Sequence, residues 1–486
     1  MKKQMNTPLF KALLEHNKKN PISFHVPGHK NGQNIQSEAS HFFEQILKMD
    51  VTELSGLDDL HSPEGVILEA EQLLAELFQT RKSFFLVNGS TVGNLAMIMA
   101  ACRENDTVLV QRNCHKSVLN ALRLAKVRPI FLEPEYDHDW KVATCVNVDT
   151  VKEAIGLYSN VKAIILTYPN YYGIVSDLEG IIKEAHLHHI PVLVDEAHGA
   201  HFNIGHPFPA SAVQLGADIV VQSAHKTLPA MTMGSYLHVN GHLVDVNKVK
   251  DYLQIFQSSS PSYPIMASLD LARKYLATYT KQDLDALQKS IKHFKAELED
   301  IPGIKVLAYP NHQGDLLKVT IQTRSNFSGF ELQKRLEEEA VYTELADPYN
   351  VLLVLPLLKE GQRYPFEVTA RKIKKVCKNL PFHEQKSKLT MSNRKVSGLA
   401  IPYKEMDDLE SMDVPIAEAI GFVCAETIIP YPPGIPLLLK GEEITIERVN
   451  QVQRLLETGA RFQGGSLLTL GKVKVFKKQG CVKEQC

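Results

Sequence analysis

The 486-residue sequence lacks an apolar segment long enough to cross a membrane. Its longest apolar runs, such as LAMIMAAC and VLLVLPLL, fall well short of the roughly 20 residues that a membrane-spanning helix needs. The N-terminal segment MKKQMNTPLFKALLEHNKKN also has no apolar stretch of the kind that a signal peptide carries. The sequence therefore predicts a cytoplasmic protein that makes no membrane contact.

A charge imbalance and a paired-cysteine motif are missing as well. Lys and Arg number 54 against 55 Asp and Glu, a net charge of −1, which gives no support for a nucleic-acid-binding or anionic-membrane surface. The seven cysteines include no CxxC pair, as is typical of a reducing compartment. We interpret Cys481 and Cys486, near the end of the chain, as exposed thiols.

Short apolar runs alternate with helical patterns between about residues 83 and 240, and this alternation predicts the fold class. Strands that are apolar on both faces and separated by helices indicate an α/β domain with a mostly parallel sheet. Ligands of such sheets bind at the carboxyl ends of the strands. The predicted strands are SFFLV, TVLVQ, RPIFLE, VKAIILT, IPVLV, DIVVQ and MGSYLHV.

The chain is too long for one compact core, so two to four domains are expected. The polar, basic stretch HEQKSKLTMSNRKVSG is predicted to be a linker. The predicted parts are an N-terminal arm (1–35), a large domain (36–265), a small α+β domain (266–385) and a C-terminal α/β domain (386–486).

Polar residues follow several of the predicted strands. After SFFLV, the segment NGSTVGN places Gly89, Ser90 and Thr91 at the start of a helix, where free N–H groups and hydroxyls suit a phosphate. Ser and Thr are equally the usual helix caps without any ligand. After TVLVQ comes His115, which alone is most simply a capping or solvent-facing histidine.

An acid and a lysine complete this set. Asp195 directly follows the apolar run IPVLV, and a carboxylate at that depth is costly without a cationic partner. Lys226 follows DIVVQ in the segment SAHKTLPAMTMGS, and it is either a surface lysine or one that forms a Schiff base with a carbonyl cofactor. Together, phosphate donors, a stacking group, a buried acid and a lysine at strand ends meet the needs of pyridoxal 5'-phosphate (PLP). The alternative is a zinc site formed by Asp195, His198 and His201, which leaves Lys226 and the Ser-Thr turn unexplained.

Five motifs resemble those of the Orn/Lys/Arg decarboxylase family of fold-type-I PLP enzymes, and they occur in the family's order over nearly the whole chain. The resemblance implies an aspartate-aminotransferase-like large domain and no metal. Larger bacterial members carry an additional N-terminal receiver-like domain, which we expect this chain to lack. The motifs are HVPGHK, LDDLHSPEG, DEAHGAH, SAHKTLPAMTMGS and PYPPGIP.

The resemblance also implies a role for each matching residue. Lys226 would form the Schiff base, Asp195 would pair with the pyridinium nitrogen, and His115 would stack on the ring. A hydroxyl from Ser258–Pro264 of a neighbouring subunit would reach the phosphate, so the active site would be shared in a homodimer. Glu426 would recognise the distal cation of the substrate, unless it makes a surface salt bridge. The remaining cofactor contacts would come from Gly89, Ser90, Thr91, His198, Ser223 and His225.

The implied reaction is decarboxylation of arginine, lysine or ornithine to the corresponding amine and CO₂, in polyamine metabolism. Lys226 or His198 would return the proton to Cα. The family usually has Thr where this sequence has Asn170, which can still donate to the cofactor's phenolic oxygen. Two other interpretations stay open, namely another PLP reaction, such as that of an aminotransferase or a lyase, and a non-catalytic relative that only binds the cofactor.

Overall fold

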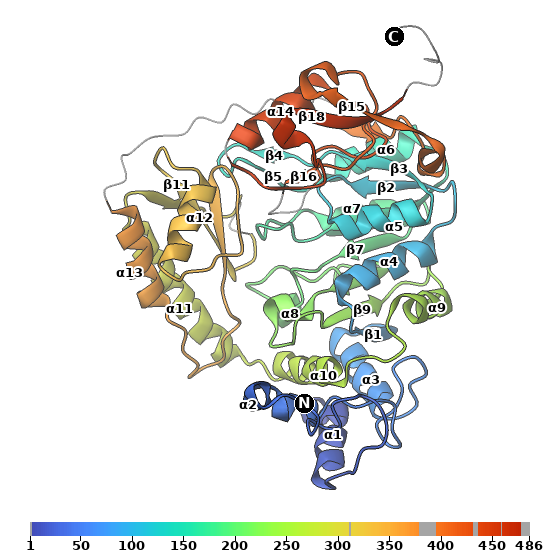
Figure 1. The fold of residues 1–486 in the computed structure, drawn as a ribbon, viewed down its shortest axis with the longest axis vertical. Coiled ribbons are helices and arrows are strands. Elements are labelled where there is room, and N and C mark those ends of the chain that lie inside the picture. The colour runs from blue at the N-terminus through green and yellow to red at the C-terminus, as the bar shows by residue number, and fades with distance from the viewer. Residues whose placement is uncertain (1, 311–312, 379–394, 431–435, 458, 478–486) are drawn as a thin grey trace. The chain divides into compact units, whose positions relative to one another are not determined.

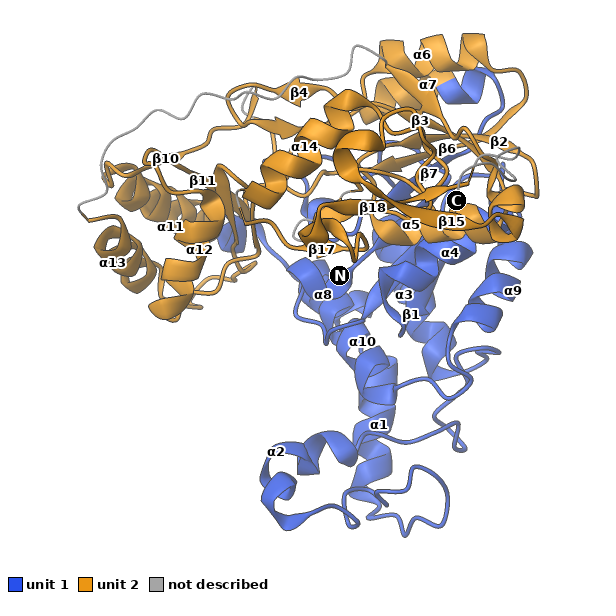
Figure 2. Ribbon diagram, turned by 45° about the horizontal axis from the view of Figure 1, so that its top comes forward, with its two compact units in different colours: residues 1–101, 185–284 blue, residues 102–184, 285–486 orange. Residues whose placement is uncertain are grey.

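The computed structural model describes residues 2–310, 313–378, 395–430, 436–457 and 459–477. It consists of two compact units (Figure 2). Unit 1 contains residues 1–101 and 185–284, and unit 2 contains residues 102–184 and 285–486. Two helices, α7 (Leu178–Leu187) and α11 (Lys281–Glu299), carry the chain across the unit boundaries.

Unit 1 is built on four strands in the order β1-β9-β8-β7. Strands β7 and β8 are parallel, and β9 runs antiparallel to both of its neighbours. Since two antiparallel steps restore the direction, β1 points the same way as β7 and β8, and the carboxyl ends of all three lie at one edge. The strands are β1 (Lys82–Leu86), β7 (Val192–Asp195), β8 (Ile219–Gln222) and β9 (Ser235–Val239).

Helices of unit 1 alternate with its strands as predicted, and a long helix, α10, follows them (Figure 1). Helix α4 packs closely on the sheet because Gly93 has no side chain. A Cβ atom there would lie 2.7 Å from Val221 Cγ1 and 2.8 Å from Leu86 Cδ1. The helices are α1 (Pro8–Lys18), α2 (Ser37–Leu47), α3 (Val66–Phe78), α4 (Gly89–Ala101), α8 (Ala224–Thr227), α9 (Val246–Phe256) and α10 (Tyr263–Ala277).

Unit 2 contains strands in the order β6-β2-β3-β14. Strands β6, β2 and β3 are parallel, as predicted, whereas β14 (Val396–Gly398) pairs antiparallel with β3. The end of the predicted linker is therefore a strand, and its earlier residues lie outside the described ones. The remaining elements of this region are β2 (Thr107–Gln111), α5 (Lys116–Leu124), β3 (Arg128–Leu132), β4 (Tyr136–Asp137), β5 (Val142–Ala143), α6 (Val148–Leu157) and β6 (Val161–Thr167).

A second sheet of unit 2, in the order β10-β11-β13-β12, is antiparallel throughout. Figure 1 shows α11, α12 and α13 beside it, in yellow and orange. This arrangement agrees with the α+β character predicted for the stretch. The elements are β10 (Ile304–Val306), β11 (Lys318–Thr323), α12 (Gly329–Glu338), β12 (Leu345–Ala346), β13 (Asn350–Val354) and α13 (Phe366–Cys377).

The C-terminal stretch of unit 2 has its own apolar cluster, which includes Ile428, Val452 and Val475. Helix α14 packs two buried valines into this cluster, Val449 and Val452, and leaves its other face for polar residues. The elements are β15 (Ser411–Pro415), β16 (Ile429–Pro430), α14 (Ile446–Glu457), β17 (Phe462–Gln463) and β18 (Lys472–Phe476). Residues 431–435 of PYPPGIP, and Cys481 and Cys486, lie outside the described residues.

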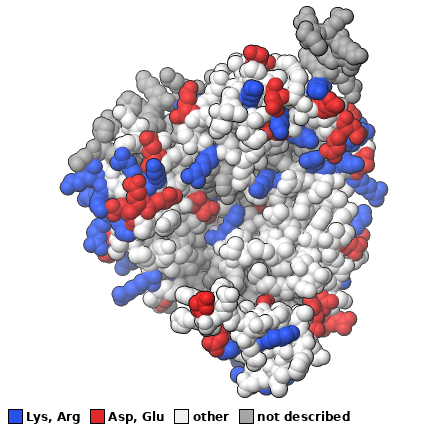
Figure 3. Space-filling view, viewed as in Figure 1, with Lys and Arg blue, Asp and Glu red and all other residues white. Residues whose placement is uncertain are grey.

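The described residues were compared with what a membrane-spanning helix and a surface of one charge sign would require. No described helix combines the length and apolarity that a membrane crossing requires. Lys and Arg side chains are interspersed with Asp and Glu on the face shown in Figure 3.

Candidate active site

Three strand ends meet in unit 1 and bring predicted site residues into contact. Ser223 follows β8, and its Oγ donates to Ser90 Oγ at 2.8 Å, in the segment after β1. Asp195 ends β7, and its Oδ2 accepts a hydrogen bond from Asn94 Nδ2 of α4 at 2.8 Å. The sheet topology therefore brings together residues that lie more than 100 positions apart in the sequence, and it places them at one edge.

Lys226 lies in α8, one helical turn directly after β8. Its Nζ is 3.0 Å from Nε2 of His198, which comes from the loop after β7. His198 is buried, whereas Lys226 is only partly buried. An ammonium group donates to this nitrogen when the imidazole is neutral, so the pair can hold and exchange a proton at these two atoms.

The carboxylate of Asp195 is 2% exposed and held in one orientation. Its Oδ2 accepts from Asn94, and its Oδ1 accepts from the backbone N–H of Ala197 at 3.1 Å. Both donors are neutral. A buried carboxylate oriented in this way is well suited to pair with a cation such as a protonated ring nitrogen.

Helix α4 begins at Gly89, whose φ of +81° is in the left-handed region that favours glycine. The Gly89 N–H donates to the carbonyl of Met233 at 2.9 Å, which ties the turn to the segment after Lys226. Ser90 and Thr91 then occupy the first helical turn, where backbone N–H groups have no intrahelical acceptor. His225 Nδ1 is 3.0 Å from the carbonyl of Gly234 and therefore carries a proton.

These residues fit PLP. An amine, a buried acid and a helix start with two hydroxyls are the groups that the cofactor's aldehyde, ring nitrogen and phosphate require. The hydroxyl of Thr227, next to Lys226 in the chain, is buried and has no hydrogen-bond partner among the described residues. Within those residues no group of three or more His, Cys, Asp or Glu is arranged to hold a metal ion, so the zinc alternative gains no support.

Three predicted site residues belong to unit 2. His115 caps α5, its Nδ1 accepting from the Ser117 N–H at 3.2 Å, and this bond orients the ring. The side-chain oxygen of Asn170 accepts from the N–H groups of Tyr172 and Ile174 and so stabilises its own turn. The roles of His115 and Asn170 toward the cofactor stay predictions.

Glu426, also in unit 2, has a clear local role. Its two carboxylate oxygens accept from the backbone N–H groups of Gly465 at 2.9 Å and Lys474 at 3.0 Å. These bonds tie three segments of the C-terminal stretch together. Both interpretations of Glu426, a surface salt bridge and recognition of the substrate's distal cation, stay predictions.

Two residues of this region, Asn94 and Glu196, were not among the predicted site residues. Asn94 is a buried polar residue within the otherwise apolar helical pattern TVGNLAMIMAAC, and that position was the available signal. Glu196 is fully buried beside Asp195, where it accepts hydrogen bonds from Ser211, Ala212 and Gln222. Burial raises the pKa of Glu196 to about 8, although these three hydrogen bonds lower it. The sequence feature that could have pointed to Glu196 is the second acid of the motif DEAHG.

Comparisons with known proteins identify the family to which the chain is similar. The family model described as Orn/Lys/Arg decarboxylase, major domain, matches residues 7–321, and the model of the C-terminal domain matches residues 385–475. The chain is 48% identical to the uncharacterized protein YaaO of Bacillus subtilis, over 97% of this chain and 99% of that protein. It is 33% identical to an arginine decarboxylase of Bacillus anthracis, over 98% of each chain.

Solved structures show the same fold. The constitutive lysine decarboxylase of Escherichia coli matches with a TM-score of 0.78 and 20% identity, over 97% of this chain and 82% of that one. The lysine decarboxylase LdcF of Francisella novicida matches with a TM-score of 0.79 and 21% identity, over 98% and 81%. A serine palmitoyltransferase of Sphingomonas wittichii, at 17% identity, covers 74% of this chain and 86% of that one with a TM-score of 0.52.

The structural matches confirm the predicted α/β, fold-type-I architecture. The family models cover most of the sequence, and a relative above 30% identity covers nearly all of it. The chain therefore belongs to the Orn/Lys/Arg decarboxylase family, whose members are PLP-dependent amino-acid decarboxylases.

Proposed function

We propose that this protein binds PLP through Lys226 and decarboxylates a basic amino acid, with arginine as the first candidate. The observation that carries the proposal is the Lys226–His198 pair, 3.0 Å apart, at the same sheet edge as Asp195 and the Ser90–Ser223 contact. Arginine is preferred because the named relatives at 30 to 33% identity are arginine decarboxylases, whereas the lysine decarboxylases are at 24 to 25%.

Each residue has a defined task in this proposal. Bound PLP supplies an electron sink for the electron pair that is released when CO₂ leaves. Lys226 would hold the cofactor through Nζ. Asp195, fixed by Asn94, keeps the ring nitrogen protonated. His198 and Lys226 hold the proton that is delivered to Cα, and Ser90, Thr91, Ser223 and His225 anchor the phosphate.

Homodimer formation is part of the proposal. Ser258, Ser259 and Ser260 are exposed and therefore accessible to a second subunit, and Ser258 Oγ donates to the Ser260 carbonyl at 3.2 Å. Ser258 is itself held in place, because its N–H donates to Asn88 Oδ1 at 3.2 Å and its carbonyl contacts His61 Nε2 at 2.8 Å. We assign the 258–264 segment to the phosphate site of the partner and the amine product to polyamine metabolism.

The test is to incubate the cofactor-loaded protein separately with arginine, lysine and ornithine and to detect agmatine, cadaverine or putrescine by mass spectrometry. Lys226→Ala should abolish amine formation and the absorbance of the cofactor–lysine linkage. Lys248→Ala, which removes an exposed lysine of α9, is the matched control and should change neither.

The outcomes separate the alternatives. One amine from the wild type alone supports the decarboxylase and names its substrate. The cofactor spectrum with no amine from any of the three substrates would contradict the proposed reaction and favour an aminotransferase, a lyase or a binding-only relative. Normal turnover by Lys226→Ala would exclude Lys226 as the cofactor lysine.

A further inference from the structure

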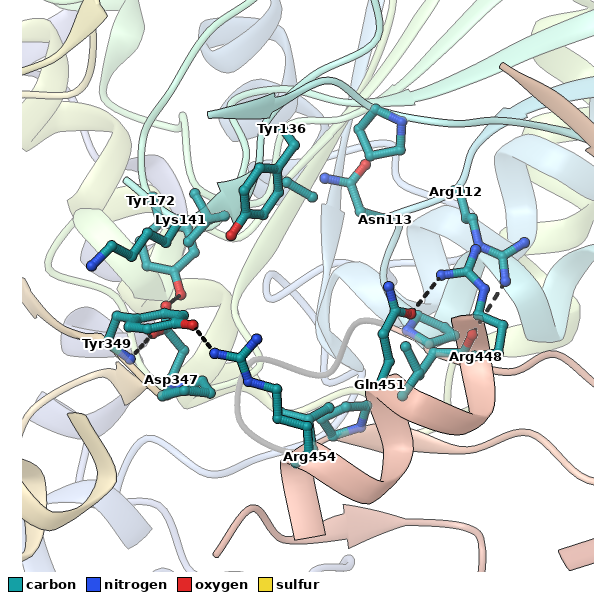
Figure 4. Close-up of a pocket in the computed structure, with 18 of the residues that line it drawn as sticks. Arg112, Asn113, Tyr136, Lys141, Tyr172, Asp347, Tyr349, Arg448, Gln451 and Arg454 are labelled. Carbon is teal, nitrogen blue, oxygen red and sulfur yellow. Dashed lines mark hydrogen bonds between the residues drawn. The ribbon is translucent and has the colours of Figure 1, made fainter. Parts of the chain in front are cut away.

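A cavity of about 240 Å³ lies wholly within unit 2 (Figure 4). Its walls come from the segment between β2 and β5, from the turn after β12, and from α14. None of the residues assigned to the cofactor or to Cα protonation is among its described lining residues. The cavity is therefore a separate feature that the proposed reaction does not use.

The lining carries more positive than negative charge. Arg112, Lys141, Arg448 and Arg454 face two carboxylates, those of Glu133 and Asp347. A further acid, Glu442, binds Arg112 from outside the cavity. Even with Glu442 included, four cations stand against three acids.

One end of the cavity has two guanidinium groups that share a carboxylate. Glu133 Oε1 lies 3.4 Å from Arg112 Nε and 3.3 Å from Arg448 Nη2. Arg112 is 3% exposed, and its buried Nη1 has no hydrogen-bond partner among the described residues. Burial and the neighbouring Arg112 charge hold the pKa of Arg448 below its usual value, whereas Glu442 and Glu133 raise the pKa of Arg112 despite its burial.

The other end of the cavity combines cations with an aromatic ring. Arg454 Nη2 donates to the Tyr349 hydroxyl, and Lys141 Nζ lies 4.7 Å from the centre of that ring. Asp347 accepts from the Tyr172 hydroxyl, and burial raises the pKa of Asp347 although this hydrogen bond lowers it.

The geometry of α14 directs its polar residues into the same space. Arg448, Gln451 and Arg454 are three residues apart, so they lie along one side of the helix, next to the side that carries the buried Val449 and Val452. Figure 4 shows the three side chains together at the cavity. Apolar surface fills the remaining wall, contributed by Pro134, Phe330, Pro348, Pro436, Leu437 and Leu455.

We propose that this cavity binds a small organic anion with one carboxylate or phosphate group on a single flat, apolar ring. The anion would engage the arginines, and the ring would contact the apolar wall. The cavity volume is below the roughly 300–1,000 Å³ of sites for drug-sized ligands, which limits the ligand to about one ring. The excess positive charge excludes the basic substrate from the same space.

Isothermal titration calorimetry on the full-length, PLP-loaded protein tests the assignment. The probes are benzoate and phenyl phosphate, with inorganic phosphate and neutral benzyl alcohol for comparison. Both aryl anions should bind once per chain. Arg454→Met and Lys141→Met should each weaken binding about tenfold or more, the usual effect of losing a charge-assisted hydrogen bond or a close charge. Arg461→Met is the matched control, because Arg461 is exposed and does not line the cavity.

Each outcome either supports the anion site in this cavity or contradicts it. Aryl-anion binding that is weakened in both cavity variants and unchanged in Arg461→Met supports the site. If benzyl alcohol bound as tightly as the aryl anions, charge would not contribute to recognition. If inorganic phosphate bound as tightly as the aryl anions, the ring would not contribute. Unchanged affinity in both cavity variants would place any binding elsewhere. None of these results depends on amine production, so the proposed decarboxylation is tested separately.

Discussion

Glu196 should make the stability of unit 1 depend on pH in a predictable direction. The carboxyl group is fully buried and accepts from Ser211 Oγ at 2.8 Å, Gln222 Nε2 at 2.6 Å and the Ala212 N–H at 2.6 Å. Burial outweighs these bonds and raises the pKa from 4.5 to about 8. Between these two values the folded protein binds a proton that the unfolded chain has released, so the free energy of unfolding falls as the pH rises.

The size of the effect follows from the two pKa values. Each pH unit in this window costs up to about 1.4 kcal/mol, so from about pH 6 to pH 8.5 the loss amounts to roughly 2.5 kcal/mol. Glu196→Gln removes the titration and keeps the volume. The side-chain oxygen of the new Gln can still accept from Ala212. Its NH₂ can donate to Ser211 Oγ, and to Gln222 once the Gln222 amide turns over.

The assay is hydrogen exchange, measured by mass spectrometry on peptides that cover β7 and β8. It reports the free energy of local opening and does not require two-state unfolding of the whole chain. The protection of the wild type relative to Glu196→Gln should fall roughly seventyfold between about pH 6 and pH 8.5. Taking this ratio cancels the contribution of Glu71, another buried acid, whose pKa is raised to about 7.

Glu64→Gln, a substitution of an exposed acid of unit 1, is the control and should leave the ratio to wild type constant. A ratio that is also constant for Glu196→Gln would refute the reasoning, because Glu196 would then titrate at the same pH in the folded and unfolded chain.

Three further predictions concern the site and its support. Asn94→Ala should lower kcat by about tenfold or more while the cofactor stays bound, because Asp195 loses an orienting donor; an unchanged pH profile and kcat would argue against that role. His198→Gln should lower kcat by about 10²- to 10⁴-fold with a smaller change in KM, measured by steady-state kinetics, if this imidazole carries the Cα proton. Gly93→Ala should destabilise unit 1 by about 1–3 kcal/mol in urea unfolding, since the new Cβ would lie 2.7 Å from Val221; wild-type stability would mean that α4 shifts freely.

The sequence was most informative about the strands of the α/β region. Runs such as VKAIILT and TVLVQ coincide with β6 and β2 because both faces of a parallel strand are covered, which leaves an uninterrupted apolar signal. Val396–Gly398 carries no such signal. It is a three-residue edge strand next to β3, held by backbone hydrogen bonds that any sequence can make, and it was therefore predicted to belong to a linker.

Site residues could be predicted where the topology alone brings them together. Asp195, Ser223 and Lys226 lie at the carboxyl ends of strands that share one edge, so their meeting there could be expected from their order along the chain. Contacts such as Asn94 to Asp195 depend on how deeply α4 packs against the sheet, which is decided by Gly93 and its neighbours in space. Periodicity does not contain that information.

The adjacent acids Asp195 and Glu196 would have different tasks in the proposed function. Successive side chains at a strand end point to opposite faces, so Asp195 faces α4 and Asn94, while Glu196 faces Ser211 and Gln222. Asp195 is held by neutral donors and would pair with a cationic ring nitrogen. The hydrogen bonds of Glu196 lock the backbone of the loop that carries His198. Burial raises the pKa of Glu196 to about 8, so a protonated Glu196 would not compete with Asp195 for that cation.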